Sequence, residues 1–383
     1  MRRTSAAVVA AGAVLCLGLT ACSGEGAGGA GDAGGAASKD AMVGVSMPTQ
    51  TSERWIADGN SVKERLEDAG YGVNLQYAND DIPTQSQQID QMITQGADAL
   101  IIAAIDGTAL SSQLQAAKDA GIPVISYDRL IRNTPNTDFY VTFDNFKVGV
   151  AQANALLTGL GLRKADGSDG TAKGPFAVEL FAGSLDDNNS VFFWDGAMSV
   201  LKPLITDGTL VVESGQTKIE QAAILRWQQE TAQRRMEDLL TSTYNDGRRV
   251  DGVLSPYDGL SRGIITALQN AGYGPTADAE TPMPVVTGQD AEIASVKLVA
   301  DGVQQSTIFK DTRKLAEQAA RAAQAFLEGG TPEANDTKTY DNGVKVVPSF
   351  LLPVETVYRD TIKTALVDTG YYTAQEVASG KAD

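Results

Sequence analysis

Short runs of apolar residues alternate with longer amphipathic stretches along most of the chain. From position 42 onward the short runs are rich in Val and Ile, whereas the longer stretches repeat apolar residues every three or four positions. The first pattern is typical of buried parallel strands and the second of helices that cover a sheet. The sequence therefore predicts an α/β fold, with helices at residues 53–69, 84–95, 108–120, 145–161, 189–205, 220–243, 258–271, 291–300, 312–327 and 355–367.

Glycines mark the ends of several predicted helices. Gly70, Gly121, Gly208, Gly272 and Gly302 each lie just past a helical stretch, where a left-handed residue commonly closes the last turn. About ten strand–helix units in about 340 residues exceed one comfortable sheet, so we expect two lobes. Alternation alone leaves open whether the lobes are sequential or interleaved by chain crossings.

Polar and aromatic side chains follow the ends of seven predicted strands. Because ligands bind just beyond the carboxyl ends of strands in an open parallel sheet, these side chains predict one shared binding site. Their chemistry favours a small, polar and neutral molecule, and a sugar fits best. The runs ending near positions 47, 105, 127, 181, 254, 288 and 309 lead to Arg54-Trp55, Asp106, Asp128-Arg129, Asp186–Asn189, Tyr257-Asp258, Gln289-Asp290 and Lys310.

A sugar ring offers paired hydroxyls on its edge and C–H patches on its faces. Planar carboxylate, amide and guanidinium groups hold two adjacent hydroxyls, and flat aromatic rings cover the faces at small entropic cost. The candidates for the edge are Arg54, Asp128, Arg129, Asp187, Asn188, Asn189, Asp258 and Asp290, and those for the faces are Trp55, Trp194, Trp227 and Tyr257.

Each candidate also has a structural explanation. Asp128 and Arg129 fit an ion pair in a loop, and Asp187, Asp258 and Asp290 fit helix N-caps. The tryptophans fit the core side of amphipathic helices, and the lysine at position 310 fits a solvated surface. The shared position after strands is what favours a binding site.

Catalysis is disfavoured by composition and by the motifs that the sequence lacks. The chain has no histidine, which excludes Ser-His-Asp and Cys-His catalysis and His-ligated metal sites. It also lacks a Gly-x-Ser-x-Gly elbow, a Walker motif and a dinucleotide fingerprint. Two acids at one site resemble a glycosidase pair, but the sequence shows no separation for them. Residues 186–189 lack the alternating ligand spacing of a calcium loop. We expect no enzyme, no cofactor and no metal.

The N-terminal residues resemble a lipoprotein export signal. Arg2 and Arg3 precede an apolar stretch at residues 6–19, which is too short to span a bilayer. Leu19-Thr20-Ala21-Cys22 forms a cleavage box, so residues 1–21 are expected to be removed and the Cys22 thiol to take the lipid, with palmitate among its acyl chains. The alternative is an ordinary secretory signal with an incidental cysteine. Residues 22–40, rich in Gly and Ala, predict a flexible tether with a reach of ~20–25 Å.

The cysteine count and the net charge further limit the class of protein and its partners. Cys16 and Cys22 are the only cysteines, so the exported domain has no disulfide and depends on a large core. The formal charge is −17, and removal of residues 1–21, which carry two arginines and no acid, leaves −19. This acidity argues against nucleic acid and anionic lipid as partners. A DNA-binding regulator on the same lobes is disfavoured, because a signal and a tether precede position 42.

Many segments resemble one family, the periplasmic sugar-binding proteins of ABC transporters, in its xylose-binding and multiple-sugar-binding (ChvE-like) branch. They run in family order over nearly all of residues 42–372. The xylose branch has Asn where this chain has Tyr257, before the strand-end Asp258, and this difference favours the multiple-sugar branch. The matching segments are residues 53–55, 105–107, 127–131, 143–145, 183–189, 195–198, 201–203, 225–227, 255–259, 288–291 and 308–311.

The resemblance implies two Rossmann-like lobes of the type I periplasmic-binding-protein fold, with a ligand cleft between them. It implies residues 41–143 plus 304–331 for lobe 1, and 144–303 plus 332–383 for lobe 2. The family's sugar contacts carry over to Arg54, Asp128, Arg129, Asp187, Asn189, Trp227, Asp258, Asp290 and Lys310, with Trp55, Asn188 and Trp194 beside them.

The expected function is that of a membrane-anchored substrate-binding lipoprotein. It would capture glucose, galactose, arabinose or xylose by hinge closure and deliver the sugar to the permease subunits of an ABC importer. We expect a monomer, held by the lipid on Cys22 at the outer face of the cell membrane. The alternative is a binding lipoprotein for another polar metabolite, such as a polyol or a signalling sugar derivative.

Overall fold

The computed structural model describes residues 40–275 and 281–382. The expected export signal, its Cys22 and nearly all of the expected tether lie outside these residues. Within the described ranges, every helix is too short or too polar to cross a membrane.

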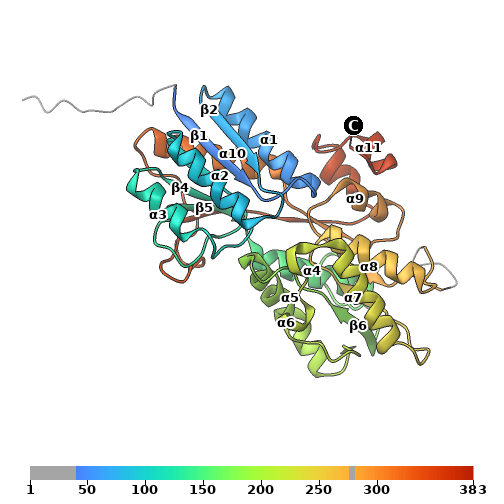
Figure 1. Cartoon of the computed structure of the whole chain (residues 1–383). Coiled ribbons are helices and arrows are strands. Elements are labelled where there is room, and N and C mark those ends of the chain that lie inside the picture. Colours follow the sequence, from blue (N-terminus) through green and yellow to red (C-terminus); the bar gives the residue numbers. More distant parts are fainter. Residues whose placement is uncertain (1–39, 276–280, 383) are drawn as a thin grey trace, which may run out of the picture. The chain divides into compact units, whose positions relative to one another are not determined.

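Six parallel strands form the first sheet, and helices cover both of its faces (Figure 1). Successive side chains of β3 (Ala99–Ile102) point to opposite faces of the sheet, so both faces carry apolar residues that helices cover. Ala99 and Ile101 enter the core beneath α1 (Glu53–Asp68) and α10 (Thr312–Leu327), whereas Leu100 and Ile102 enter the core beneath α2 (Ile82–Thr94) and α3 (Ser111–Asp119). The strand order is β11 (Ser349–Leu352), β5 (Phe139–Phe143), β4 (Val124–Tyr127), β3 (Ala99–Ile102), β1 (Met42–Met47) and β2 (Gly72–Tyr77).

A second sheet of four parallel strands has the same construction. In its strand β8 (Gly252–Leu254), Val253 packs with α7 (Gln229–Ser242) and α8 (Asp258–Asn270). The next residue, Leu254, faces the other side and packs with α4 (Asn145–Gly159) and α5 (Asn188–Thr206). The short helix α6 (Ile219–Ala222) precedes α7. The strand order is β7 (Leu210–Val211), β6 (Phe176–Leu180), β8 (Gly252–Leu254) and β9 (Val285–Val286).

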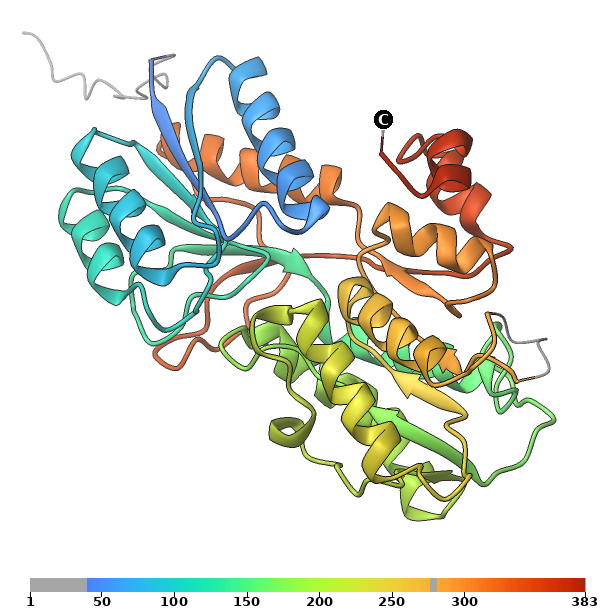
Figure 2. The same ribbon diagram turned by 45° about the vertical axis from the view of Figure 1, so that its right-hand side comes forward.

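The chain passes between the two sheets three times. It leaves the first sheet after β5, and a bridge between Gln289 and Ile308 places β10 (Thr307–Phe309) beside the second sheet. After β10 it returns through α10 to β11, and then leaves again to β12 (Glu355–Val357), which pairs antiparallel with β10. Figure 2 shows the first passage in green and the two later ones in orange and red, with the C-terminal α11 (Ala374–Ser379) next to α9 (Ile293–Ala300).

The structure confirms the two-lobed α/β class and shows that the lobes are interleaved. Two of the expected lobe boundaries differ from the strand pairing. Residues 349–352 pair with β5 in the first sheet, although the family resemblance implied lobe 2 for residues 332–383. Residues 307–309 pair with β12 and lie beside the second sheet, although residues 304–331 were placed in lobe 1. These strands of three or four residues are too short to reveal their sheet from the apolar pattern.

Most predicted helices are present, and the glycine caps are confirmed, with φ between 74° and 92° at Gly70, Gly121, Gly208, Gly272 and Gly302. Two helix predictions were wrong. Residues 355–367 form β12 and a π-helical turn, η2 (Lys363–Val367). The predicted helix 220–243 is broken by a 3₁₀ turn, η1 (Leu225–Trp227), because Arg226 and Trp227 take left-handed φ angles of 56° and 55°.

Candidate functional site

A cavity lies between the carboxyl ends of the strands of the two sheets, with about 360 Å³ of empty space when the adjoining open solvent is included. Segments from both lobes contribute to its wall, including the start of α1, the end of β4, the start of α5 and the end of β10. Its lining residues are Ser52, Arg54, Trp55, Asp128, Arg129, Asp187, Asn189, Phe193, Trp227, Tyr257, Gln289, Asp290 and Lys310.

Arg54 is the most heavily paired cation of the site. It lies in the first turn of α1 and is 6% exposed. Its Nε donates to Asp58 Oδ2 at 3.0 Å, and its Nη1 donates to Asp128 Oδ2 at 3.3 Å and to Asp290 Oδ1 at 3.5 Å. The neighbouring Trp55 ring lies under the guanidinium, 4.5 Å from Cζ to the ring centroid. These contacts leave the side chain little freedom.

Asp128 follows β4 in a left-handed conformation, with φ of 57°. Its backbone carbonyl accepts hydrogen bonds from Tyr140 Oη at 2.6 Å, Thr142 Oγ1 at 3.0 Å and Asn189 Nδ2 at 2.9 Å. These three bonds stabilise the unusual turn and direct the carboxylate into the cavity. Burial opposes ionisation, but Arg54 and other nearby cations hold the pKa of Asp128 below its usual value.

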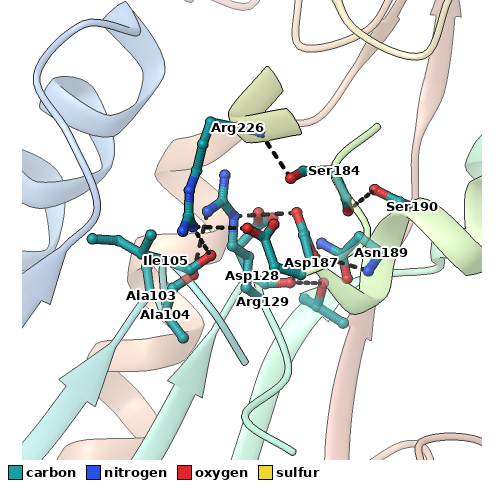
Figure 3. Close-up of polar contacts among 12 residues, drawn as sticks. Ala103, Ala104, Ile105, Asp128, Arg129, Ser184, Asp187, Asn189, Ser190 and Arg226 are labelled. Carbon is teal, nitrogen blue, oxygen red and sulfur yellow. Dashed lines mark hydrogen bonds and ion pairs between the residues drawn. The ribbon is translucent and has the colours of Figure 1, made fainter. Parts of the chain in front are cut away.

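Arg129 and Asp187 face each other across the cavity from different lobes (Figure 3). Arg129 Nε lies 3.2 Å from Asp187 Oδ2. Asp187 also caps α5, since it accepts a hydrogen bond from the Asn189 backbone N–H at 2.9 Å. Burial raises the pKa of Asp187. The capping explanation and the binding explanation of this aspartate are therefore compatible.

Asp290 and Lys310 form a second buried ion pair, with Lys310 Nζ 2.9 Å from Asp290 Oδ1. Lys310 is only 2% exposed, so it is not a surface lysine. Asp290 has a left-handed φ of 91°, just after β9. Three cations and three carboxylates line the cavity, which makes its wall electrically neutral at pH 7 when all six are ionised.

Aromatic rings provide the apolar part of the wall. The Trp227 ring lies edge-on to Phe193 at 6.3 Å and to Tyr257 at 6.1 Å between centroids. Gly183 lets it approach, because a Cβ atom there would stand 1.9 Å from the ring. The buried Nε1 of Trp227 has no hydrogen-bond partner among the described residues. An indole N–H that faces a cavity in this way is available to a polar ligand.

Nine of the twelve predicted binding residues line the cavity, and three do not. Trp194 packs in the core of the second lobe, one position beyond Phe193, which takes the cavity side of α5. Asn188 begins α5 but lies outside the wall. Asp258 is fully buried, and its carboxylate accepts from Gln304 Nε2 at 2.8 Å and from Thr307 Oγ1 at 2.9 Å.

Three lining residues were not among the candidates, Ser52, Phe193 and Gln289, whereas Tyr257, named as a candidate for a sugar face but not among the twelve, does line the cavity. Tyr257 and Gln289 stand in two of the strand-end clusters, so the sequence held a signal for them. Phe193 differs by one helix position from the predicted Trp194. Ser52 had no such signal, because it lies in the loop before α1, several residues beyond the end of β1.

The chain is similar to known sugar-binding proteins. The family described as "Periplasmic binding protein domain" matches residues 43–331. The multiple sugar-binding periplasmic receptor ChvE of Rhizobium radiobacter is 56% identical over 341 residues, 89% of this chain and 93% of ChvE. The D-xylose-binding periplasmic protein of Escherichia coli is 34% identical over 342 residues, 89% of this chain and 94% of that protein.

A solved structure is similar over the same region. It is an ABC transporter solute-binding protein from Clostridium phytofermentans with bound β-D-glucose. The TM-score is 0.81 at 44% sequence identity, and the match covers 88% of this chain and 99% of the other.

Proposed function

Because the chain belongs to the periplasmic binding protein domain family, we propose that it is the substrate-binding component of an ABC sugar importer. Its ligand is a neutral monosaccharide of the glucose, galactose, arabinose or xylose type. The observation that carries the proposal is the cavity wall, in which three ion-paired acids and three cations stand beside aromatic rings. ChvE and the glucose-bound Clostridium protein support the same ligand class.

The wall residues match the two surfaces of a sugar. Asp128, Asp187 and Asp290 each offer carboxylate oxygens to hydroxyl donors, and Arg54 and Arg129 offer N–H groups to hydroxyl acceptors. Trp55 and Trp227 provide flat apolar surface for the faces of the ring. A charged ligand would unbalance the neutral wall, which favours a neutral sugar.

Hinge closure is the proposed capture mechanism. Direct contacts join the two lobes beside the cavity. The Gly107 backbone N–H donates to the Asp186 carbonyl at 3.1 Å. Arg226 Nη1 donates to the Ile105 carbonyl at 3.3 Å, as Figure 3 shows. We propose lobe 1 as residues 41–143 plus 312–352, lobe 2 as the remainder to residue 382, and the three passages between them as the hinge. Opening breaks the contacts and admits the sugar.

Anchoring completes the proposal. The Leu19–Cys22 box supports lipid attachment at Cys22, and the tether would hold a monomeric domain near the outer face of the membrane. The closed form would then present its sugar to the permease subunits of the importer. Each of these partners follows from the sequence pattern and the family.

A thermal-shift screen of the purified protein tests the ligand class. We expect aldopyranoses such as D-glucose or D-xylose to raise the melting temperature, since a ligand that binds only the native state adds about 2.7 kcal/mol at a hundredfold excess over its dissociation constant. Amino acids are the negative control. A shift with xylitol but with no aldose would favour the polyol alternative. A screen in which no carbohydrate or polyol shifts the transition would refute the proposal.

A further inference from the structure

Asp58 lies directly behind the cavity without lining it. It is one helical turn beyond Arg54 in α1 and has no exposed surface. Its Oδ2 atom is 3.0 Å from Arg54 Nε and 2.9 Å from Arg54 Nη2. The Nε atom makes a hydrogen bond to this oxygen, and Nη2 adds a close ion-pair contact without hydrogen-bond geometry.

The contacts of Arg54 with the cavity carboxylates are longer. The distances are 3.3 Å to each oxygen of Asp128 and 3.5 Å to Asp290 Oδ1. Asp128 Oδ1 has no hydrogen-bond partner of good geometry in the described part of the chain. Asp58 thus receives the two short contacts, and the cavity carboxylates keep acceptor capacity that a ligand hydroxyl can use.

Tyr127 holds Asp58 from the other side. Its buried hydroxyl donates to Asp58 Oδ1. Tyr127 is the last residue of β4 and directly precedes Asp128, so one strand end fixes both the cavity aspartate and the residue behind it. The two oxygens of Asp58 are divided between Tyr127 and Arg54.

We propose that Asp58, held by Tyr127, is a positioning residue for ligand binding. It draws the Arg54 guanidinium back and so keeps Asp128 and Asp290 free to accept hydrogen bonds from a sugar. The inference rests on the proposed function, because it assigns a role toward that ligand. Without the Asp58 charge, Arg54 closes onto Asp128 and Asp290 and competes with the sugar for their oxygens.

The surroundings of Asp58 make this role dependent on pH. Burial raises the pKa of Asp58 to about 6, against the opposing effect of Arg54. The charged or titratable groups that face it are Arg54 on α1, Tyr127 and Asp128 at β4, Tyr77 on β2 and the C-terminal Tyr371. Protonation below about pH 6 removes the charge that draws Arg54 back, so sugar affinity decreases as the pH falls through this range.

Calorimetric titration of the purified protein with D-glucose between about pH 5 and pH 8 tests the proposal. Asp58→Asn keeps the shape of the side chain and removes its charge. We expect its affinity for D-glucose to fall at least about tenfold, the equivalent of one charge-assisted hydrogen bond, and not to decrease further between pH 8 and pH 5 as that of the natural protein does.

Tyr127→Phe keeps the Asp58 charge and removes the hydroxyl that lowers its pKa. We expect near-natural affinity at pH 8 and a decrease that begins at a higher pH than in the natural protein. A purely structural role would change stability without shifting this pH profile. The matched control is Glu179→Gln, which alters another buried carboxylate that accepts from a tyrosine, Tyr244, at 2.8 Å in the second lobe. We expect it to leave affinity and its pH profile unchanged.

The outcomes separate the two proposals. If the natural protein binds neither D-glucose nor any other aldose, the proposed function fails. If it binds an aldose and Asp58→Asn binds with the same affinity and pH profile, the positioning role is refuted. An unshifted profile in Tyr127→Phe, with its fold intact by circular dichroism, also contradicts the role.

Discussion

The Asp290–Lys310 pair allows ligand binding and stability to be separated by mutation. Asn fits the left-handed φ of 91° at position 290 better than most residues do, so Asp290→Asn removes a charge with little backbone strain. The loss of a hydrogen bond between a sugar hydroxyl and a carboxylate costs about 1.5–3 kcal/mol. The dissociation constant for D-glucose should therefore increase about ten- to hundredfold.

The same substitution leaves Lys310 without its near partner. Lys310 is 2% exposed, and its next acid, Asp128, lies 3.9 Å away. Removing one member of a buried ion pair costs up to about 3–5 kcal/mol, and the Asp128 carboxylate reduces that cost. We expect Asp290→Asn to lower the free energy of unfolding without ligand.

The double variant Asp290→Asn with Lys310→Met provides the control. Methionine keeps most of the volume of lysine between the rings of Phe143 and Phe193 and removes the unpaired charge. Stability, measured by denaturant unfolding, should recover in the double variant, whereas glucose affinity, measured by calorimetry, should stay low. An unchanged affinity in Asp290→Asn, or a recovered affinity in the double variant, would refute the assignment of Asp290 as a ligand group.

Three further predictions test other parts of the structure. Burial raises the pKa of Asp258 to about 8, so the folded protein retains a proton that the unfolded chain, with its usual pKa of about 3.9, releases. The stabilisation from this proton is fully present below about pH 4 and is lost as the pH rises toward about 8. In thermal unfolding, Asp258→Asn should therefore lose less stability across this pH range than the natural protein does. An equal loss in both proteins contradicts the argument. Gly183→Ala should displace the Trp227 ring, since its Cβ would stand 1.9 Å away; tryptophan fluorescence should change and glucose affinity should fall, and unchanged values for both would be the contrary result. Cys22→Ser should release the protein from the membrane fraction into the medium, and continued membrane association would exclude lipid attachment at this residue.

The carboxyl ends of the strands were readable in the sequence, and so was most of the site. Asp128, Asp290 and Lys310 each follow an apolar run, and parallel strands bring such positions to one edge by geometry alone. The polar identity of these residues then indicated the ligand class. The glycines after helices were equally readable, because left-handed caps depend on local conformation.

Tertiary structure decided which neighbours face the cavity. Consecutive residues of a helix point about 100° apart, so the sequence did not distinguish Phe193, which lines the cavity, from Trp194, which packs in the core. The same limit applies to Asp258, whose carboxylate accepts hydrogen bonds from Gln304, Thr307 and the Glu292 backbone N–H, all distant in the chain. Contacts between residues far apart in the chain leave no local pattern.

The sequence pattern also did not show how the C-terminal segment is divided between the two lobes. β10, β11 and β12 contain three or four residues each, and so short an apolar run fits either sheet. Their partners decide their place, since β11 pairs with β5 and β12 pairs with β10. Local apolar patterning determined the α/β class and the strand-end chemistry, whereas long-range strand pairing determined how the two lobes are connected.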